Sequence, residues 1–502
     1  MLASRGLCAA RRKWAAGALL TAPLIACPAP SLAADVEVSS TTAAQGYSLR
    51  SPYGDPVLSR RRFMQTLGLV VRGIEGEDRK PGGPEITVRI RMRLDADFGL
   101  GWGEYHDWTP PNRFVPGLQQ APFDLMYGYV DMRRLAGGVL DVRLGRQYVI
   151  DPLGWWSFDG AMIRSQLPFK VALESYTGFE QRGGLALSTP RFERDGVWRG
   201  DRTGLEPSYY PEFLPSGYAP AWGGAVETWG TKHFNLRASY RKVWSSAPAT
   251  TRMTALAAGE VPQAWTGMRT STERLGASGN LYFDDLGDLR AGAVYDVYSS
   301  LFSSYYATLD LFPARWLTVG SDADRFVPTF DADSIFNWFS HYPMTTWTGR
   351  AELAMSRAVD ASVSGGVRWV ETSTDPEGDD SGGRSHLTDV IGRAGVRHRA
   401  GTGAAGASAM LERGERGHRQ GIDLFANRLL QERWHVLART SLYDWKDELR
   451  PDRSATSFGY VLGGGYRPGP LTQVMLEWEH NTNRLVGQRF RVMVWLQMMV
   501  TR

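Results

Sequence analysis

The chain has 502 residues, and its 57 lysines and arginines slightly outnumber its 53 aspartates and glutamates. Four of these bases and no acid precede Ala34, so removing four from 57 leaves 53 bases against 53 acids in the rest of the chain. This balance excludes a partner attracted by bulk positive charge, such as nucleic acid.

The first 33 residues have the order of a secretory signal peptide, with a basic start, an apolar run over residues 14–26 and small residues at 31–34. The sequence therefore predicts export and cleavage near Ala33. Cys8 and Cys27, the two cysteines of the chain, would be removed with this segment, which excludes disulfides, thiolate metal sites and covalently attached haem from the mature protein. In a second interpretation, Leu24–Cys27 is a lipoprotein cleavage box and Cys27 is acylated.

Residues 34–60 are predicted to form an N-terminal segment, either periplasmic or a first strand, and residues 61–502 one continuous architecture. Within the latter, residues 86–98 alternate without error between apolar side chains, from Ile86 to Phe98, and polar ones. A period of two residues indicates a β-strand. Its length suits the roughly 9 to 11 residues, or slightly more, that a tilted strand needs to cross a bilayer.

The same alternation recurs along the chain, at residues 234–241, 289–297, 305–311, 347–355, 361–369, 434–444, 474–478 and 490–500. Spacers of two sizes separate the strands: short ones at 135–138 and 284–288, and long ones at 99–122, 178–222, 245–271, 322–346 and 371–387. Short periplasmic turns and long extracellular loops are typical of outer-membrane barrels. The sequence therefore predicts an all-β transmembrane antiparallel β-barrel of about 20 to 22 strands, within a range of roughly 16 to 22.

One long spacer, residues 190–222, is rich in Pro, Gly, Tyr and Trp and is too long for a plain connection. Two interpretations are open. The segment folds inwards as a constriction or plug, or it forms an outward surface loop.

The sequence Asp141-Val-Arg-Leu-Gly-Arg-Gln147 and the sequence Ser157-Phe-Asp-Gly160 form a motif pair. The pair resembles the L-x-x-G-R-Q … F-D-G pattern of many outer-membrane porin and alginate-export-like barrels. The resemblance implies that the first element is a strand that ends at a turn and that the second begins the next strand. It covers about a tenth of the chain and implies the architecture rather than the cargo.

The polar faces of the predicted strands carry charges that we expect to point into water, because a charge on the lipid face costs about 2 to 4 kcal/mol near the bilayer midplane. The candidate pore-lining residues are Arg89, Arg91, Arg93, Asp95, Asp97, Arg237, Arg241, Arg290, Asp296, Asp310, Arg368, Glu477 and Glu479. They would either create a field that orients polar solutes or form a salt-bridged network that stiffens the wall.

Three other patterns suggest chemistry, and each has a simpler interpretation. Gly401–Gly406 matches a dinucleotide fingerprint but lies between two predicted strands, which favours a turn. Residues 375–383 offer carboxylates that suit calcium, without an ordered ligand spacing. His480 faintly resembles the His-x-Ser site of outer-membrane lipid esterases, with Thr482 in the place of the serine. No catalytic residue, metal site or cofactor is predicted.

The first functional hypothesis is a porin-like, non-enzymatic channel of the bacterial outer membrane. It would pass small hydrophilic or anionic solutes by passive diffusion through a mixed-charge, Arg-rich lumen. Its expected partners are outer-membrane lipid and these solutes, and a homo-oligomer is compatible with the pattern. The alternative is a structural barrel that sheathes a periplasmic or extracellular multihaem cytochrome in an electron conduit. A third hypothesis is a lipid esterase centred on His480.

Overall fold

The structure is a computed structural model that describes residues 34–76, 82–97, 123–181, 219–245, 268–329, 342–373, 384–447, 454–484 and 487–501. These residues form one sheet of 22 strands. In chain order the strands are β1 (Asp35–Arg50), β2 (Pro56–Arg72), β3 (Glu85–Asp97), β4 (Phe123–Arg134), β5 (Leu140–Asp151), β6 (Gly154–Leu167), β7 (Val171–Glu180), β8 (Pro220–Thr228), β9 (Phe234–Ser245), β10 (Arg269–Phe283), β11 (Gly287–Asp296), β12 (Leu301–Ala314), β13 (Leu317–Phe326), β14 (Met344–Ala354), β15 (Val359–Ser373), β16 (Arg384–Ala400), β17 (Gly403–Gly414), β18 (Gly417–Leu430), β19 (Trp434–Asp447), β20 (Ser454–Gly469), β21 (Thr472–Asn483) and β22 (Gly487–Thr501). Helical turns occur at α1 (Leu135–Gly138) and at Pro168–Lys170.

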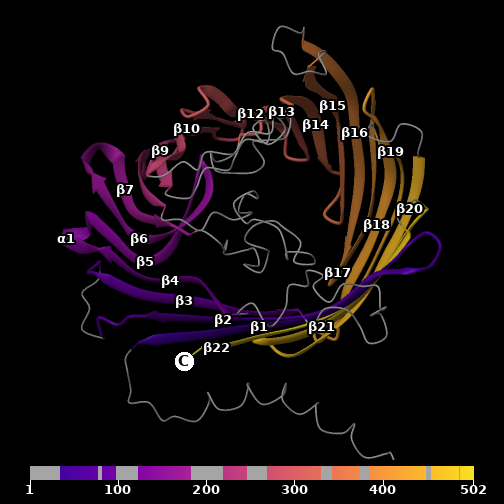
Figure 1. Cartoon of the computed structure of the whole chain (residues 1–502), viewed down its shortest axis with the longest axis horizontal. Helices are drawn as coiled ribbons and strands as arrows, with labels where there is room; N and C mark the ends of the chain where they lie inside the picture. The colour runs from indigo at the N-terminus through magenta and orange to yellow at the C-terminus, as the bar shows by residue number, and fades with distance from the viewer. Residues whose placement is uncertain are drawn as a thin grey trace, which may run out of the picture.

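The sheet closes on itself, as the ring of strands in Figure 1 shows. β1 pairs antiparallel with β2 on one side and with β22 on the other, so Ala43 lies opposite both Met64 and Trp495. Closure pairs the backbone groups of every strand and leaves no free edge. The predicted all-β antiparallel transmembrane barrel is therefore confirmed, and its 22 strands agree with the predicted number.

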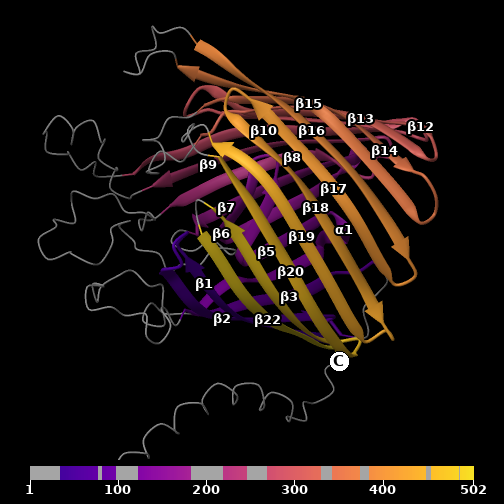
Figure 2. The same ribbon diagram turned by 90° about the vertical axis from the view of Figure 1, so that its right-hand side faces the viewer.

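The strands are long and run at a tilt around the barrel, as Figure 2 shows from the side, and a tilted strand needs about 9 to 11 residues to cross a bilayer. They run from 9 residues in β8 to 17 in β2 and β16, whereas strands of globular proteins average about five or six. The perfectly alternating segment predicted as a strand at 86–98 is β3. No helix among the described residues is long and apolar enough to cross a membrane.

The connections differ between the two ends of the barrel, as the spacer lengths predicted. At one end, here called the short-turn end, Gly401 and Thr402 alone join β16 to β17, and α1 joins β4 to β5. The four longest connections, residues 98–122, 181–219, 246–268 and 327–343, all follow odd-numbered strands and so belong to the opposite end, whereas the connection at 73–84, after β2, belongs to the short-turn end. β1 starts and β22 finishes at the short-turn end.

The barrel begins at Asp35, because β1 lies within residues 34–60. Of the two interpretations given for residues 34–60, a periplasmic segment or a first strand, the structure has the strand. The sequence left the two open because the side chains of β1 are mostly small and polar, and the apolar alternation there is weak. The predicted signal peptide at 1–33 lies outside the described residues. Of the predicted plug at 190–222, only residues 219–222 are described, and Pro220 already begins β8.

Cross-strand register carries each side chain to one of two faces around the ring. The charged face holds Arg237, Arg274 and Asp296. Arg241, four residues along β9 from Arg237 and so on the same face, lies opposite Arg274, and Arg274 lies opposite Asp296. The apolar face holds the residues between them, such as Leu236 and Leu275, which are 50% and 47% exposed. Apolar side chains are left exposed where the surrounding medium is lipid rather than water.

A small buried core lies on the charged face, at the β5–β6 hairpin. It consists of Val149, Trp156, Phe158, Tyr176, Ala219, Ala221 and Val243. The rings of Trp156 and Phe158 stack with centroids 4.5 Å apart, and Phe158 and Val243 are fully buried. An apolar cluster on this face was not predicted, because the alternation indicates only which residues share a face and not what covers them.

Candidate functional site

Eleven of the thirteen candidate pore-lining residues lie on the charged face. Residues opposite each other in register share a face of the sheet. Arg93 of β3 lies opposite Thr66 of β2, and Thr66 lies opposite Thr41 of β1. On the other side of β1, Tyr47 lies opposite Arg491 of β22, and Arg491 lies opposite Glu479 of β21. The set consists of Arg89, Arg91, Arg93, Arg237, Arg241, Arg290, Asp296, Asp310, Arg368, Glu477 and Glu479. Asp95 and Asp97 belong to β3, and their side chains lie outside the described part of the structure.

Several members of the set are joined in ion pairs along this face. Arg237 donates to Glu174 on β7 at 2.7 Å and to Glu227 on β8 at 2.5 Å. Arg274 pairs with Asp296 at 3.2 Å, and the Asp296 side chain is 3% exposed. A buried carboxylate is stable only when paired and hydrogen-bonded. The acidic members of these pairs therefore help to hold neighbouring strands together.

Two further pairings bring in residues that sequence reasoning missed. Arg350 on β14 reaches both Asp310 and Asp322, and Glu479 accepts from both Arg489 and Arg491. The missed arginines occupy polar positions of alternating strands, so the alternation could have identified Arg350 within residues 347–355 and Arg489 at the start of β22.

Other arginines of the set have no carboxylate partner among the described side chains. Arg89 has none, and Arg91 donates to the hydroxyl of Thr66 at 3.3 Å. Arg241 is 5% exposed and donates to the carbonyl of Leu153 at 3.2 Å, with its guanidinium carbon 5.1 Å from the centre of the Trp156 ring. A positive excess therefore remains on part of the charged face.

The contact between Arg241 and Leu153 shows how the β5–β6 hairpin is placed. β6 and β9 are three strand spacings apart, roughly 14 Å along the sheet, yet the tip of the hairpin reaches the side chain of Arg241. It also reaches β10, since a Cβ placed on Gly276 would lie 2.6 Å from Leu153 Cδ2 and 3.2 Å from Pro152 Cβ. The hairpin tip (Asp151–Gly154) therefore folds over the charged face. Gly276 is required there because the tip packs directly on its backbone.

The motif pair lies in this hairpin. Gly145, Arg146 and Gln147 of β5 lie directly opposite Gly160, Asp159 and Phe158 of β6. Gln147 is fully buried, and its amide donates to the carbonyl of Gly160 at 3.0 Å. Gly145 has φ 123°, and a Cβ there would lie 2.3 Å from the carbonyl oxygen of Gly128, which requires glycine.

A hollow of about 670 Å³ adjoins the hairpin on the charged face. Arg89, Tyr129 and Arg143 line it on β3 to β5, and Tyr148 and Ile150 line it from the hairpin. Tyr129 is 8% exposed. Six arginines line this hollow, among them Arg89 and Arg237 of the candidate set.

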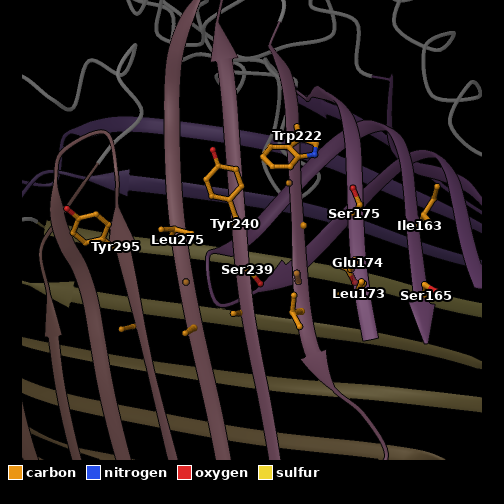
Figure 3. A pocket seen from close by; sticks show the side chains of 18 of the residues that line it. Ile163, Ser165, Leu173, Glu174, Ser175, Trp222, Ser239, Tyr240, Leu275 and Tyr295 are labelled. Atoms are coloured by element: carbon orange, nitrogen blue, oxygen red, sulfur yellow. The ribbon is translucent and has the colours of Figure 1, made fainter. Parts of the chain in front are cut away.

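A second hollow, of about 790 Å³, lies on the apolar face (Figure 3). Trp222 on β8 and Tyr240 on β9 contact each other there with ring centroids 5.0 Å apart. Most of its lining is apolar, and its floor includes Gly224, Ala238 and Ala277. It belongs to the face that carries the exposed aliphatic side chains and contains none of the candidate pore-lining residues.

The other sequence patterns assemble no catalytic or metal centre among the described residues. The ring of His480 stacks on Phe490 at 4.2 Å and meets Tyr460 at 5.5 Å, and no described serine hydroxyl bonds to it. Gly401 and Thr402 form the turn between β16 and β17, as the simpler interpretation predicted. No group of three potential metal ligands occurs among the described residues. The carboxylate-rich segment 375–383 lies outside them.

No protein-family model matches the sequence, and no curated protein matches it. Among solved structures, a mutant of the ferric enterobactin receptor PfeA of Pseudomonas aeruginosa is similar, with TM-score 0.52, 10% identity and coverage of 92% of this chain and 80% of that chain. OccAB4 of Acinetobacter baumannii has TM-score 0.43 and 6% identity, and OpdQ of P. aeruginosa has 0.41 and 10%; each match covers 93% of this chain and 98% of the other. At these identities the likeness concerns the barrel fold alone. The resemblance of the motif pair to porin and alginate-export-like barrels stays a prediction.

Proposed function

We propose that the protein is a porin-like channel of the bacterial outer membrane, that its charged face lines the pore, and that it passes small hydrophilic solutes with a preference for anions. The observation that carries the proposal is the division of the closed sheet into a charged face and an apolar face. The contact of the hairpin tip with Arg241, three strands away, supports an inner position for the charged face. The reason is that a segment that leaves one strand of a ring reaches a strand three positions away by a short path only on the concave side.

The anion preference is supported by the unequal pairing of charges. The described acidic residues of the candidate set, apart from Glu477, are held by arginines. By contrast, Arg91 and Arg241 donate to neutral partners, and Arg89 has no carboxylate partner among the described side chains. Unneutralised guanidinium groups in a narrow aqueous passage raise the local concentration of anions.

Planar-bilayer recording of the purified protein tests this function. We expect discrete conductance steps and, in a salt gradient, a reversal potential displaced towards that of the anion. Steps that favour the cation would leave a channel but remove the anion preference. A properly folded barrel without any conductance would overturn the channel.

The two alternatives gain no support from the described residues. A sheathed cytochrome would have to share the interior with the β5–β6 hairpin, and the rings around His480 leave no activated alcohol beside it. Co-purification of a haem protein from native membranes would revive the first alternative.

A further inference from the structure

The hollow beside the β5–β6 hairpin combines two kinds of lining. On one side are arginines and carboxylates of the sheet, from Glu85 on β3 to Arg237 on β9. On the other side are Met162 on β6 and the hairpin residues Tyr148 and Ile150. Ile150 is 72% exposed, so an apolar side chain faces the open space of the hollow. A ligand that fits both sides must be amphipathic.

The charges that line the hollow do not balance. Six arginines and four carboxylates contribute, which leaves an excess of two positive charges. Most of these groups are in ion pairs. Within the lining, Arg133 pairs with Asp131 at 2.9 Å, Arg134 with Glu85 at 2.5 Å and Arg237 with Glu174 at 2.7 Å. Arg164 pairs with Glu227, which does not line the hollow. Arg89 and Arg143 are the two lining arginines outside these pairs, and the one lining carboxylate outside them, Asp141, accepts from the backbone N–H of Arg134 at 2.9 Å.

These two arginines flank one buried tyrosine. Arg89 lies directly opposite Tyr129 in the β3–β4 register, and the guanidinium of Arg143 stacks over the Tyr129 ring at 4.9 Å. The nearest carboxylate oxygen to Arg143 belongs to Asp131, at 3.6 Å, and is already held by Arg133. The Nε atoms of Arg89 and Arg143 are buried without a hydrogen-bond partner. Buried donors of this kind are stable only when an acceptor reaches them.

We propose that this hollow is a binding site for a small organic acid with an apolar body. Its carboxylate lies between the guanidinium groups of Arg89 and Arg143, and its hydrocarbon part packs against Met162, Tyr148 and Ile150. Arginine favours a carboxylate because its planar fork matches the two oxygens. The site rests on the proposed function in one respect, since the acid reaches it through the lumen.

Isothermal titration of the intact protein in detergent, with four probes, tests the site. We expect hexanoate to bind at least tenfold more tightly than acetate, which lacks the apolar body, and than inorganic phosphate. Hexanamide, which has the body without the charge, should not bind measurably. In bilayers, hexanoate should also interrupt the conductance at the concentrations at which it binds.

Three variants locate the binding. Arg89→Gln combined with Arg143→Gln should weaken hexanoate binding at least tenfold and bring it close to that of acetate. Met162→Ser should weaken hexanoate and leave acetate unchanged. Arg399→Gln, which removes an arginine paired with Asp360 at 2.6 Å on β15 and β16, is the matched control and should bind as the parent does. Folding of each variant is checked by its heat-modifiable migration on gels. If the double variant fails to fold, Arg89→Lys is tested in its place.

Equal binding of hexanoate and acetate would overturn the apolar half of the site, and full binding by the double arginine variant would overturn the site itself. These outcomes are separate from failure of the proposed function. A barrel that binds hexanoate in detergent but conducts no ions would keep the site and lose the channel.

Discussion

Arg146 on β5 and Asp159 on β6 form a two-point ion pair across the hairpin, with Nε to Oδ1 at 2.7 Å and Nη2 to Oδ2 at 2.8 Å. Both residues belong to the motif pair that stood out in the sequence. The same guanidinium donates to the carbonyl of Leu125 on β4 at 3.0 Å. The motif therefore joins three consecutive strands where the hairpin departs towards the charged face.

Replacing Asp159 by Asn should lower the stability of the barrel slightly. The Asp159 carboxylate is 45% exposed, so we expect a loss of about 1 kcal/mol or less. Urea unfolding in lipid vesicles, followed by tryptophan fluorescence, measures it. The charge-swapped variant Arg146→Asp/Asp159→Arg should recover part of the loss, and a swap no better than either single change would argue against the pair.

Gly160 should not tolerate even a methyl group. A Cβ there would lie 2.1 Å from the carbonyl oxygen of Thr177 on β7, and this backbone cannot move without breaking the β6–β7 ladder. We expect Gly160→Ala to cost roughly 1 to 3 kcal/mol, seen as a lower yield of heat-modifiable barrel. Gly464→Ala is the control, because nothing lies within 4 Å of its added Cβ. Equal yields for the two variants would contradict this reasoning.

Gly276→Leu should displace the hairpin tip from β10. Its side chain would occupy the space of Leu153 and Pro152, so the tip must lift from the charged face. If the tip narrows the pore, single-channel conductance rises, whereas Gly464→Leu leaves it unchanged. A Gly276→Leu barrel with the parental conductance would show that the tip does not limit the current.

Arg237→Met should destabilise the barrel more than Asp159→Asn does. It leaves the carboxylate of Glu174, 9% exposed, without its arginine partner, whereas Glu227 keeps its ion pair with Arg164. We expect a loss of roughly 2 to 3 kcal/mol, because an unpaired charge remains partly buried. The double variant with Glu174→Gln should recover most of it in the same urea titration. A double variant as unstable as the single one would mean that packing, not charge, is lost.

The turns of the short-turn end offer a pH test. Lys232, between β8 and β9, donates to Asp284, between β10 and β11, at 2.5 Å, and this hydrogen bond lowers the pKa of Asp284 below its ordinary 3.8. Because the folded pKa is the lower one, the stabilisation is present above pH 3.8 and is lost as the pH falls through the folded value. Lys232→Met should return the pKa towards 3.8, measured by the carbon-13 titration of labelled aspartate. An unchanged titration would mean that the contact does not persist in solution.

The local sequence was sufficient to predict the class of fold and the composition of the two faces. Side chains on a strand alternate with a period of exactly two, so residues 86–98 alone indicate a strand, its length and its charged side. The two sizes of spacer then indicate which ends of the strands carry turns. The sequence left open whether residues 34–60 hold a first strand, because β1 is too polar and too rich in small residues to show the same alternation.

Only the tertiary structure decided which charges meet and which stay unpaired. Arg237 and Glu174 are 63 positions apart, and Arg241 and Leu153 are 88 apart, so no local pattern relates them. The closure of the ring and the fold of the β5–β6 hairpin set these contacts, because they bring strands several positions apart to the same part of one face. The alternation therefore determined which arginines lie on the charged face. The packing of the hairpin decided that, of these, Arg89 and Arg143 line the proposed binding site.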